Sequence, residues 1–420
     1  MSQTEKTETP RLSEGKRHLL EQYLIGKSRN ATGTVQNASG RSQRSATKDH
    51  VFPRVRELTL EDYPRVAELE CRYGLGLKSY EQWSHIWLNN PVYHELRHNW
   101  PLGWVLEIEE NQLVGAHGNI PLLYEFNGRR LLAAQGRALV VDSRYRGYSL
   151  QLLGAFFDQS NVELCLDTTA SPESARADDV LGALRVPIGT WDSDAFWITN
   201  YSAFVLGWLG KRIPRRMSAV ARPVSYPLSA GLFLRDRLTK PRPGRIPDGM
   251  SVASCAAFDD RFDEFWEQLR KQNPGKLLAV RTRKILEWHF AYALRQQRLW
   301  IWTVTKDSRP VAYAIFLKVE NPDSSVTRVA LVDFQSLGEA SLLQPMLAEA
   351  LEQCRREGIH VLENTGLAYE QSGINKLAPY RRSRAWWIYF YRSKDRELSE
   401  QLSCPEVWNP SLYDGDASIL

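Results

Sequence analysis

The same order of sequence patterns occurs twice along the chain, and this repeat limits the fold more than any other feature. The run WVLEIEENQLVGAHGNI, which begins at Trp104, matches WIWTVTKDSRPVAYAIFL from Trp300. RALVVDSRYRGYSLQLL from Arg137 then matches RVALVDFQSLGEASLLQ from Arg328, and ELCLDTT matches HVLENTG. The order is kept while loops and helices differ slightly in length. Such a repeat predicts two copies of one fold in tandem.

Each copy combines short apolar runs with amphipathic helical segments. In the first copy, the turn signal Asn127-Gly128 separates two apolar runs and predicts a hairpin, because both residues tolerate positive φ. A helix over Leu150–Gln159 follows, then a short apolar strand over Val162–Asp167, and a last strand is expected near Ala195–Tyr201. Hairpins mixed with helices indicate an α+β fold, with a mainly antiparallel sheet flanked by helices in each copy.

Length and composition agree with two ordinary globular domains. A chain of 420 residues and 48.2 kDa can hold two domains of about 150–200 residues. No apolar run reaches the ~18 residues of a membrane-spanning helix, and the first residues lack the apolar core of a signal peptide. Five scattered cysteines without a CxxC pair indicate reduced thiols in a cytoplasm and no zinc site. A net charge of +5 is nearly neutral over this length and does not indicate a nucleic-acid-binding protein.

The patterns divide the chain into five parts. Residues 1–50 are polar and predict a disordered tail, while residues 51–205 and 251–395 hold the two copies. Residues 206–250 are rich in proline and predict a linker between the copies. Residues 396–420 form a C-terminal tail that is expected either to dock or to be disordered.

The predicted linker is strongly basic. Between Lys211 and Arg245, ten lysines and arginines accompany one acid, Asp236, so the near-neutral total hides a local charge of +9. A solvated linker is one interpretation of this charge. Contact with an anionic membrane surface is another, because clustered basic residues beside the apolar run AFVLGWLG bind anionic lipid head groups. Contact with nucleic acid is the least favoured of the three interpretations.

A short basic turn joins an apolar strand to a helix in the first copy. The strand ends at Val140 and Val141, the turn holds Arg144, Arg146 and Gly147, and a helix begins after it. Backbone N–H groups at a helix start carry positive partial charge and bind pyrophosphate, and a glycine lets a ligand approach the backbone. The turn is therefore a candidate anion site, and an ordinary strand–turn–helix connection is the alternative.

The run RGYS, which begins at Arg146 after an apolar strand, resembles the acyl-coenzyme-A loop of the GCN5-related N-acetyltransferase (GNAT) superfamily. That loop has the form Arg/Gln-x-x-Gly-x-Gly/Ala. The resemblance extends to the order of elements over residues 51–205, while Ser149 and Gln151 replace two of the glycines. It implies acyl transfer from acetyl-CoA, or another acyl-CoA, to an amine, with no metal involved.

The resemblance also implies where acyl-CoA would bind. The fourth and fifth strands, here about Leu139–Val141 and Val162–Asp167, would splay apart and hold the pantetheine arm. A backbone N–H near Val141 would stabilise the thioester oxyanion. The residues expected to contact acyl-CoA are Leu139, Val140, Val141, Arg144, Arg146, Gly147, Tyr148, Ser149 and Leu150.

The acceptor amine must lose a proton before it attacks, and three residues are candidate bases. His117 lies in the third strand, Asp167 ends the fifth strand beside two threonines, and Glu107 lies in the strand before His117. Each has an ordinary alternative: a hydrogen-bonded structural histidine, a turn aspartate and a solvent-facing glutamate. The GNAT superfamily often reprotonates the leaving thiolate with a tyrosine from the next helix, but SARADDVLGALRV contains no tyrosine.

The second copy lacks the basic turn. At the matching place it reads FQSLGEA from Phe334, and Glu339 would repel a diphosphate. This copy is interpreted as degenerate, contributing packing and a wall for the acceptor. The sequence thus predicts a cytoplasmic N-acyltransferase, in contact with the inner membrane face if the basic linker binds lipid. Its acceptor would be a small amine, such as an amino sugar of a surface polysaccharide. A Fem-type aminoacyl transferase using aminoacyl-tRNA and a non-enzymatic two-domain adaptor remain alternatives.

Overall fold

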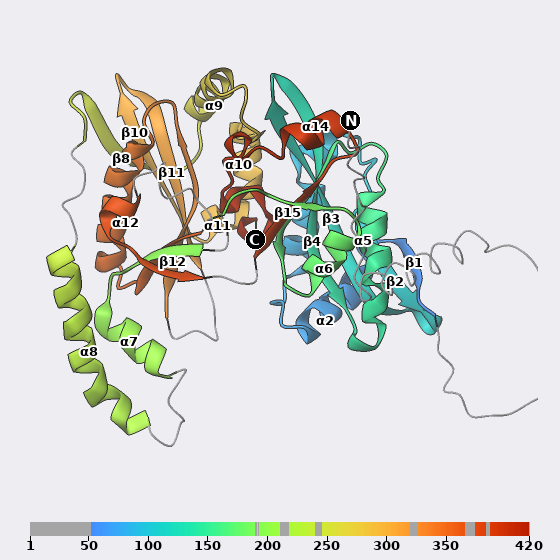
Figure 1. Cartoon of the computed structure of the whole chain (residues 1–420), viewed down its shortest axis with the longest axis horizontal. Helices are drawn as coiled ribbons and strands as arrows, with labels where there is room; N and C mark the ends of the chain where they lie inside the picture. The colour runs from blue at the N-terminus through green and yellow to red at the C-terminus, as the bar shows by residue number, and fades with distance from the viewer. Residues whose placement is uncertain are drawn as a thin grey trace, which may run out of the picture.

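The computed structural model describes residues 52–189, 191, 193–210, 218–239, 246–319, 326–365, 374–383 and 387–419. The predicted tail at 1–50 and most of the basic residues between 211 and 245 lie outside this part of the chain. Figure 1 shows two β-sheets with helices packed on them, and a pair of helices at the outer end of the second half. The predicted α+β fold, with two sheet-and-helix units, is confirmed.

The first sheet is built mainly from the first copy. Its strands follow the order β1-β2-β3-β4-β5-β15-β6, and β9 pairs with β3. All neighbours are antiparallel except β4 and β5, which are parallel. The predicted hairpin turn joins β3 to β4, and Asn127 and Gly128 have φ of 51° and 72°. The strands are β1 (Arg54–Glu57), β2 (Gly103–Ile108), β3 (Gln112–Phe126), β4 (Arg129–Val141), β5 (Leu164–Ala170), β6 (Leu184–Arg185), β9 (Leu278–Ala279) and β15 (Ile388–Arg392).

The second sheet repeats this design. Its strands follow the order β14-β7-β13-β12-β11-β10-β8, and only β12 and β13 run parallel. The parallel pair in each sheet lies at the equivalent place in the repeat, which agrees with two copies of one fold. The strands are β7 (Ser193–Ile198), β8 (Met250–Cys255), β10 (Leu299–Lys306), β11 (Arg309–Val319), β12 (Arg328–Ser336), β13 (Val361–Thr365) and β14 (Tyr380–Ser383).

The two copies exchange a strand. The strand expected near Ala195–Tyr201, at the end of the first copy, is β7, and it pairs with β13 of the second sheet rather than with its own copy. In return β15, from the end of the second copy, pairs with β5 of the first sheet. Each sheet is therefore completed by the other half of the chain. A short apolar strand can pair with any free strand edge of suitable register, so the local sequence did not reveal this partner.

Helices cover both sheets. Around the first sheet lie α2 (Tyr63–Arg72), α3 (Tyr80–Leu88), α4 (Pro91–Glu95), α5 (Ser149–Phe157) and α6 (Ser174–Val180). The second half carries α9 (Asp260–Gln272), α10 (Arg283–His289), α11 (Ala291–Arg295) and α12 (Leu343–Arg356). The helix α12 shows why such segments pack on a sheet: its buried side chains recur at helical spacing, as at Leu343, Met346, Leu347, Ala350 and Cys354.

The stretch predicted as a linker contains regular structure. The helix α7 (Tyr201–Gly210) ends within it, and the 22-residue helix α8 (Ser218–Thr239) occupies much of it, despite Pro223 and Pro227 inside the helix. The two helices lie against each other (Figure 1). Proline density alone therefore misled the sequence interpretation. No helix in the described residues combines the length and the apolar character needed to cross a bilayer.

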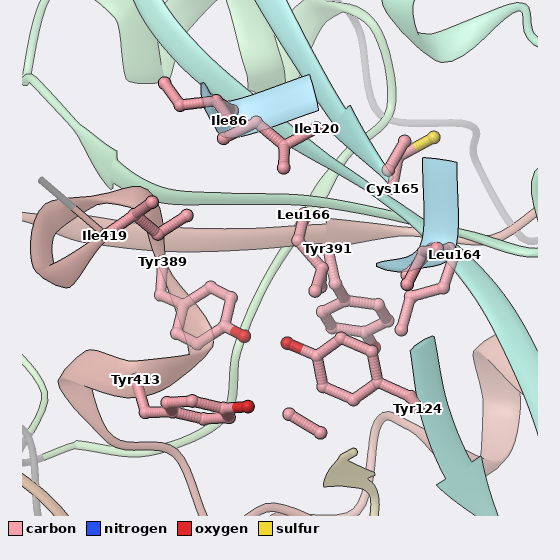
Figure 2. Packing of buried hydrophobic residues seen from close by; sticks show 14 of the residues in the cluster. Ile86, Ile120, Tyr124, Leu164, Cys165, Leu166, Tyr389, Tyr391, Tyr413 and Ile419 are labelled. Atoms are coloured by element: carbon pink, nitrogen blue, oxygen red, sulfur yellow. The ribbon is translucent and has the colours of Figure 1, made fainter. Parts of the chain in front are cut away.

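Residues after β15 are docked rather than loose. The helix α14 (Arg396–Gln401) leads into a segment whose Trp408, Tyr413 and Ile419 are buried. Figure 2 shows Tyr413 and Ile419 packed near Tyr124 of β3 and Tyr389 of β15. The Tyr413 hydroxyl donates to the Val280 carbonyl at 2.7 Å. Of the two expectations for this tail, the structure shows docking.

Candidate functional site

A cavity opens where β4 and β5 separate. The two strands pair in parallel from Ala133 and Leu164 to Gln135 and Leu166, and the pairing then stops. Beyond this point lies a cavity of about 380 Å³. Its walls come from the loop before α3, the ends of β4 and β5, the start of α6 and the C-terminal segment. They are Leu75, Gly76, Lys78, His117, Gly136, Arg137, Ala138, Leu139, Asp167, Thr169, Ala170, Ser171, Ser174 and Asp416.

A bulge in β4 shapes one wall of this cavity. Pairing with β3 shifts register between Ala116 and Gly118, so that Ala138 and Leu139 lie outside the ladder. Ala138 has φ of 50°, a conformation that residues other than glycine seldom adopt outside bulges and turns. The bulge brings the backbone of both residues to the cavity wall. Among the residues expected to contact acyl-CoA, Leu139 lines the cavity, while Val140 pairs with Ala116 again.

The basic turn after β4 forms a 3₁₀ helix over Ser143–Tyr148 before α5 begins. Its first amides already have partners. The Ser143 amide donates to the Tyr73 hydroxyl at 3.0 Å, and the next two amides donate to Asp142. These three amides are therefore bonded within the protein, and the binding of a diphosphate by the rest of the turn stays a prediction. Arg144 and Arg146 are exposed, Gly147, Tyr148, Ser149 and Val141 are half-buried, and Leu150 packs into the core.

Asp167 lines this cavity and has no cationic partner among the described residues. It directly follows Leu166, the last residue of β5 that pairs with β4, and is 8% exposed. Its carboxylate accepts a hydrogen bond from the Thr169 amide at 3.3 Å, and no ion pair to it occurs within the described residues. Burial, reinforced by the nearby charge of Asp416, raises the pKa of Asp167 to about 7. A carboxyl with this pKa can both take up and release a proton near neutral pH.

Asp178 on α6 is a second unusual acid. It is fully buried, and neither carboxyl oxygen finds a hydrogen-bond partner among the described residues. Burial first, and then the charges of Asp167 and Asp179, raise its pKa to about 9. Asp178 is therefore protonated at neutral pH. The sequence analysis overlooked it because α6 was searched for a tyrosine; the helical spacing from Ser174, which lines the cavity, was the available signal.

Charged groups of both signs complete the walls. Arg137 of β4 forms a buried ion pair with Glu70 of α2 at 3.0 Å. Lys78 lines the cavity, and burial lowers its pKa. Asp416 arrives from the C-terminal segment; burial raises its pKa, while the charges of Arg137 and Lys78 lower it. Nothing in the local sequence indicated that Asp416 would reach this cavity, because the contact depends on how the whole chain docks.

His117 faces the cavity from β3. Both ring nitrogens are buried without a hydrogen-bond partner among the described residues, and burial lowers the pKa of the ring to about 4. The backbone of Arg137 acts in the opposite direction and raises the pKa of the ring, but burial outweighs it. Phe156 packs edge-on at 5.0 Å between ring centroids, and a Cβ at Gly136 would lie 3.0 Å from the ring. His117 is thus a neutral imidazole with unused polar atoms at the cavity wall.

Glu107 lies outside the cavity. Its carboxylate pairs with Arg56 at 2.9 Å and with Arg65 at 3.7 Å. The hydrogen bond from Arg56 lowers the pKa of Glu107, which makes it a weaker base. The structure therefore brings two of the three candidate bases, His117 and Asp167, to one cavity and leaves the third in an ion-pair cluster. The described residues contain no group of three or more His, Cys, Asp or Glu placed to hold a metal ion.

Comparison with known proteins gives a structural likeness only. No family model matches the sequence, and no curated relative matches it. Saccharomyces cerevisiae N-myristoyltransferase with bound myristoyl-CoA is similar over 86% of this chain and 90% of its own, at 10% identity and a TM-score of 0.50. The same enzyme with myristoyl-CoA and inhibitors is similar over 91% and 94%, again at 10% identity and 0.50. A GCN5-related N-acetyltransferase from Anabaena variabilis reaches 12% identity and 0.49, over 82% of this chain and 73% of that one.

The likeness to N-myristoyltransferase extends over both halves of the chain and agrees with the repeat in the sequence and with the two sheets. An identity of 10% shows the fold and nothing finer. The predicted recognition is confirmed at that level: the chain has the fold of N-myristoyltransferase, built here on two sheets.

Proposed function

We propose that the chain is an acyl-CoA-dependent N-acyltransferase and that its reaction takes place in the cavity between β4 and β5. One observation carries the proposal: Asp167, an acid with a pKa near neutrality, lies where the parallel strands separate and lines the same cavity as Ala138 and Leu139 of the β4 bulge. A base and a wall of backbone amides on opposite sides of one cavity are what acyl transfer to an amine requires.

In this proposal the acyl-CoA thioester enters between the separated strands as a substrate. The backbone N–H groups of the bulge at Ala138 and Leu139 face the thioester carbonyl and stabilise the oxyanion that forms on attack. Asp167 accepts a proton from the acceptor amine, whose nitrogen bonds to the carbonyl carbon as the carbon–sulfur bond breaks. The same carboxyl can then return that proton to the leaving thiolate, so the reaction balances without a tyrosine acid.

The walls also favour a class of acceptor. Three hydroxyl side chains, Thr169, Ser171 and Ser174, line the cavity next to Asp167 and Asp416. Hydroxyls suit a polyhydroxylated ligand, and the acids attract an ammonium group. We therefore keep an amino sugar as the proposed acceptor, now on the basis of these wall residues.

Binding and turnover test this function separately. Acetyl-CoA and longer acyl-CoAs should raise the melting temperature, with one CoA bound per chain, and thiol release should require an added amine such as glucosamine. Gly147→Glu should weaken acyl-CoA binding by placing an acid in the basic turn beside Arg146. Gly338→Glu, in the matching turn of the second half, is the control and should bind normally. Two CoA molecules per chain, or no binding at all, would contradict the proposal.

A further inference from the structure

Exposed large hydrophobic side chains are concentrated on the helices α7 and α8. Fifteen large hydrophobic residues are exposed in the described part of the chain, and eight of them belong to these two helices. Tyr226 is 71% exposed and Leu238 is 77% exposed. Single exposed hydrophobics are normal on a protein surface, but a concentration on one element marks an interaction site. The eight are Leu206, Trp208, Val224, Tyr226, Leu228, Phe233, Leu234 and Leu238.

The helix α8 buries small polar and acidic side chains and exposes large apolar ones. Its buried residues are Ser225, Ser229 and Asp236, which recur at helical spacing on the side facing the protein. Of the large apolar side chains that the structure describes on this helix, only Leu232 is half-buried, and the other six are exposed. A surface helix of a water-soluble domain shows the opposite distribution, with its apolar stripe inward. The outer side of α8 is therefore built for an apolar environment rather than for bulk water.

Polar contacts fix the orientation of this helix. Asp236 accepts hydrogen bonds from the hydroxyls of Tyr201 in α7 and Tyr380 in β14, each at 2.8 Å. Arg235 pairs with Asp236 at 3.0 Å and stacks over the Tyr380 ring at 4.0 Å. The Ser229 hydroxyl donates to the Tyr201 carbonyl of α7 at 3.4 Å. These bonds hold the polar side of α8 against α7 and β14, so the exposed apolar side chains stay outward.

The charge on this outer side is basic. Arg222 and Arg237 are exposed on α8, and the one acid between Tyr201 and Thr239 is Asp236, which is buried and paired. Two copies of the chain meeting through this side would bring arginines together with no exposed acid between them. Aromatic rings, leucines and arginines on one helical surface instead match the interfacial layer of an anionic bilayer.

We propose that the outer side of α7 and α8 binds the surface of an anionic lipid bilayer, with Trp208, Tyr226, Phe233, Leu234 and Leu238 entering the head-group layer and Arg222 and Arg237 contacting lipid phosphates. In Figure 1 both helices lie at the end of the molecule farthest from the first sheet, where a flat surface can reach them. This binding does not depend on the proposed acyl transfer, because the cavity lies in the other half of the chain.

Vesicle sedimentation of the full chain tests the proposal. Vesicles of phosphatidylcholine with about one third phosphatidylglycerol should bind the chain at least tenfold more strongly than pure phosphatidylcholine, and binding should weaken as salt rises. Leu234→Ser with Leu238→Ser, and separately Arg222→Glu with Arg237→Glu, should each reduce binding about tenfold or more. Leu184→Ser, at an exposed leucine of β6, is the matched control and should bind as the parent does.

Unchanged melting temperatures in all variants establish that the chain still folds. Equal binding to neutral and anionic vesicles, or no loss in the helix variants, would overturn the proposal. A parent dimer that dissociates in the leucine variants would also overturn it, because a second copy would then cover this side. Thiol release measured in the same samples should stay at the parent level, so a failure here is distinct from a failure of the enzyme proposal.

Discussion

Two buried aspartates near the ends of the parallel strand pairs have opposite surroundings. Asp333 of β12 is 1% exposed and is bound by Arg281 at 2.8 and 3.1 Å. It also accepts hydrogen bonds from Tyr313, Gln335 and Ser411. Asp167 of β5 is nearly as buried, but it faces the cavity with one backbone hydrogen bond and an acid nearby. We call Asp333, with its cation and several hydrogen-bond donors, the saturated site. Asp167, with one backbone donor and no cation among the described residues, is the unsaturated site.

The difference teaches that burial alone does not decide what a carboxyl does. Burial opposes ionisation at both sites, but the charge and hydrogen bonds of Arg281 outweigh it and lower the pKa of Asp333. At Asp167 the one hydrogen bond from the Thr169 amide does not offset burial, and the pKa is raised to about 7. A fully paired carboxylate is fixed in charge and serves structure, whereas one that titrates near neutral pH can move protons.

The largest expected effect comes from breaking the saturated site. Asp333→Asn leaves the Arg281 guanidinium, which is 2% exposed, without its main counter-charge, and should cost about 3–5 kcal/mol of unfolding free energy. Urea unfolding followed by circular dichroism measures this loss. Asp167→Asn is the paired control: it removes a poorly solvated acid and should not lower stability at pH 8. Equal losses in the two variants would erase the contrast between the sites.

Breaking the unsaturated site should instead affect turnover. Asp167→Asn should lower kcat about 10²- to 10³-fold in the thiol-release assay, because the amide cannot accept the amine proton. The dissociation constant for acyl-CoA should stay within about twofold of the parent, since the thioester wall is built from the backbone of β4. Glu107→Gln is the control, because Glu107 lies in an ion-pair cluster outside the cavity. A loss of activity in Glu107→Gln equal to that in Asp167→Asn would refute the assignment of the base.

Part of this contrast was visible in the sequence. The repeat predicted two equivalent units, and the missing Arg-Gly pair at the turn after β12 indicated that one of them differs. His117 and Asp167 were identified because strand alternation and strand ends place side chains at a sheet edge. These two predictions needed only local patterns.

The rest depended on long-range docking. The exchange of β7 and β15 could not be read from either strand, because a short apolar strand of five or six residues suits both sheets. Asp416 reaches the cavity only because its segment packs across β5, where Thr168 contacts Gly415 closely enough to exclude any Cβ. Asp178 was visible in the sequence, but its burial without a partner was not. Charge balance at a buried site is a property of the assembled fold.

A smaller effect should appear in the pH dependence. If Asp167 acts as the base, kcat/KM should rise about tenfold per pH unit below pH 7 and level off above it, as the carboxyl deprotonates. The free energy of unfolding should instead fall as the pH rises. Because the folded pKa lies above the ordinary value near 4, the contribution of Asp167 to stability is complete below about pH 4 and is lost as the pH rises through 7. Thermal unfolding at intervals from pH 4 to 8 should show this fall, and Asp167→Asn should show a shallower one.

The smallest effect concerns the order in which Asp167, at the cavity, and Asp178, buried on α6, lose their protons. Asp178, with its pKa raised to about 9, should be uncharged while Asp167 titrates. Replacing a neutral carboxyl by an amide changes no charge at pH 7, so Asp178→Asn should leave the kcat/KM limb within about 0.3 pH units of the parent. If Asp178 instead lost its proton first, its negative charge would be what holds up the pKa of Asp167. Asp178→Asn would then shift the rising part of the kcat/KM profile to a pH about one unit lower. Rate profiles of the parent and this variant between pH 5 and 9 distinguish the two orders, because only the second requires the limb to shift.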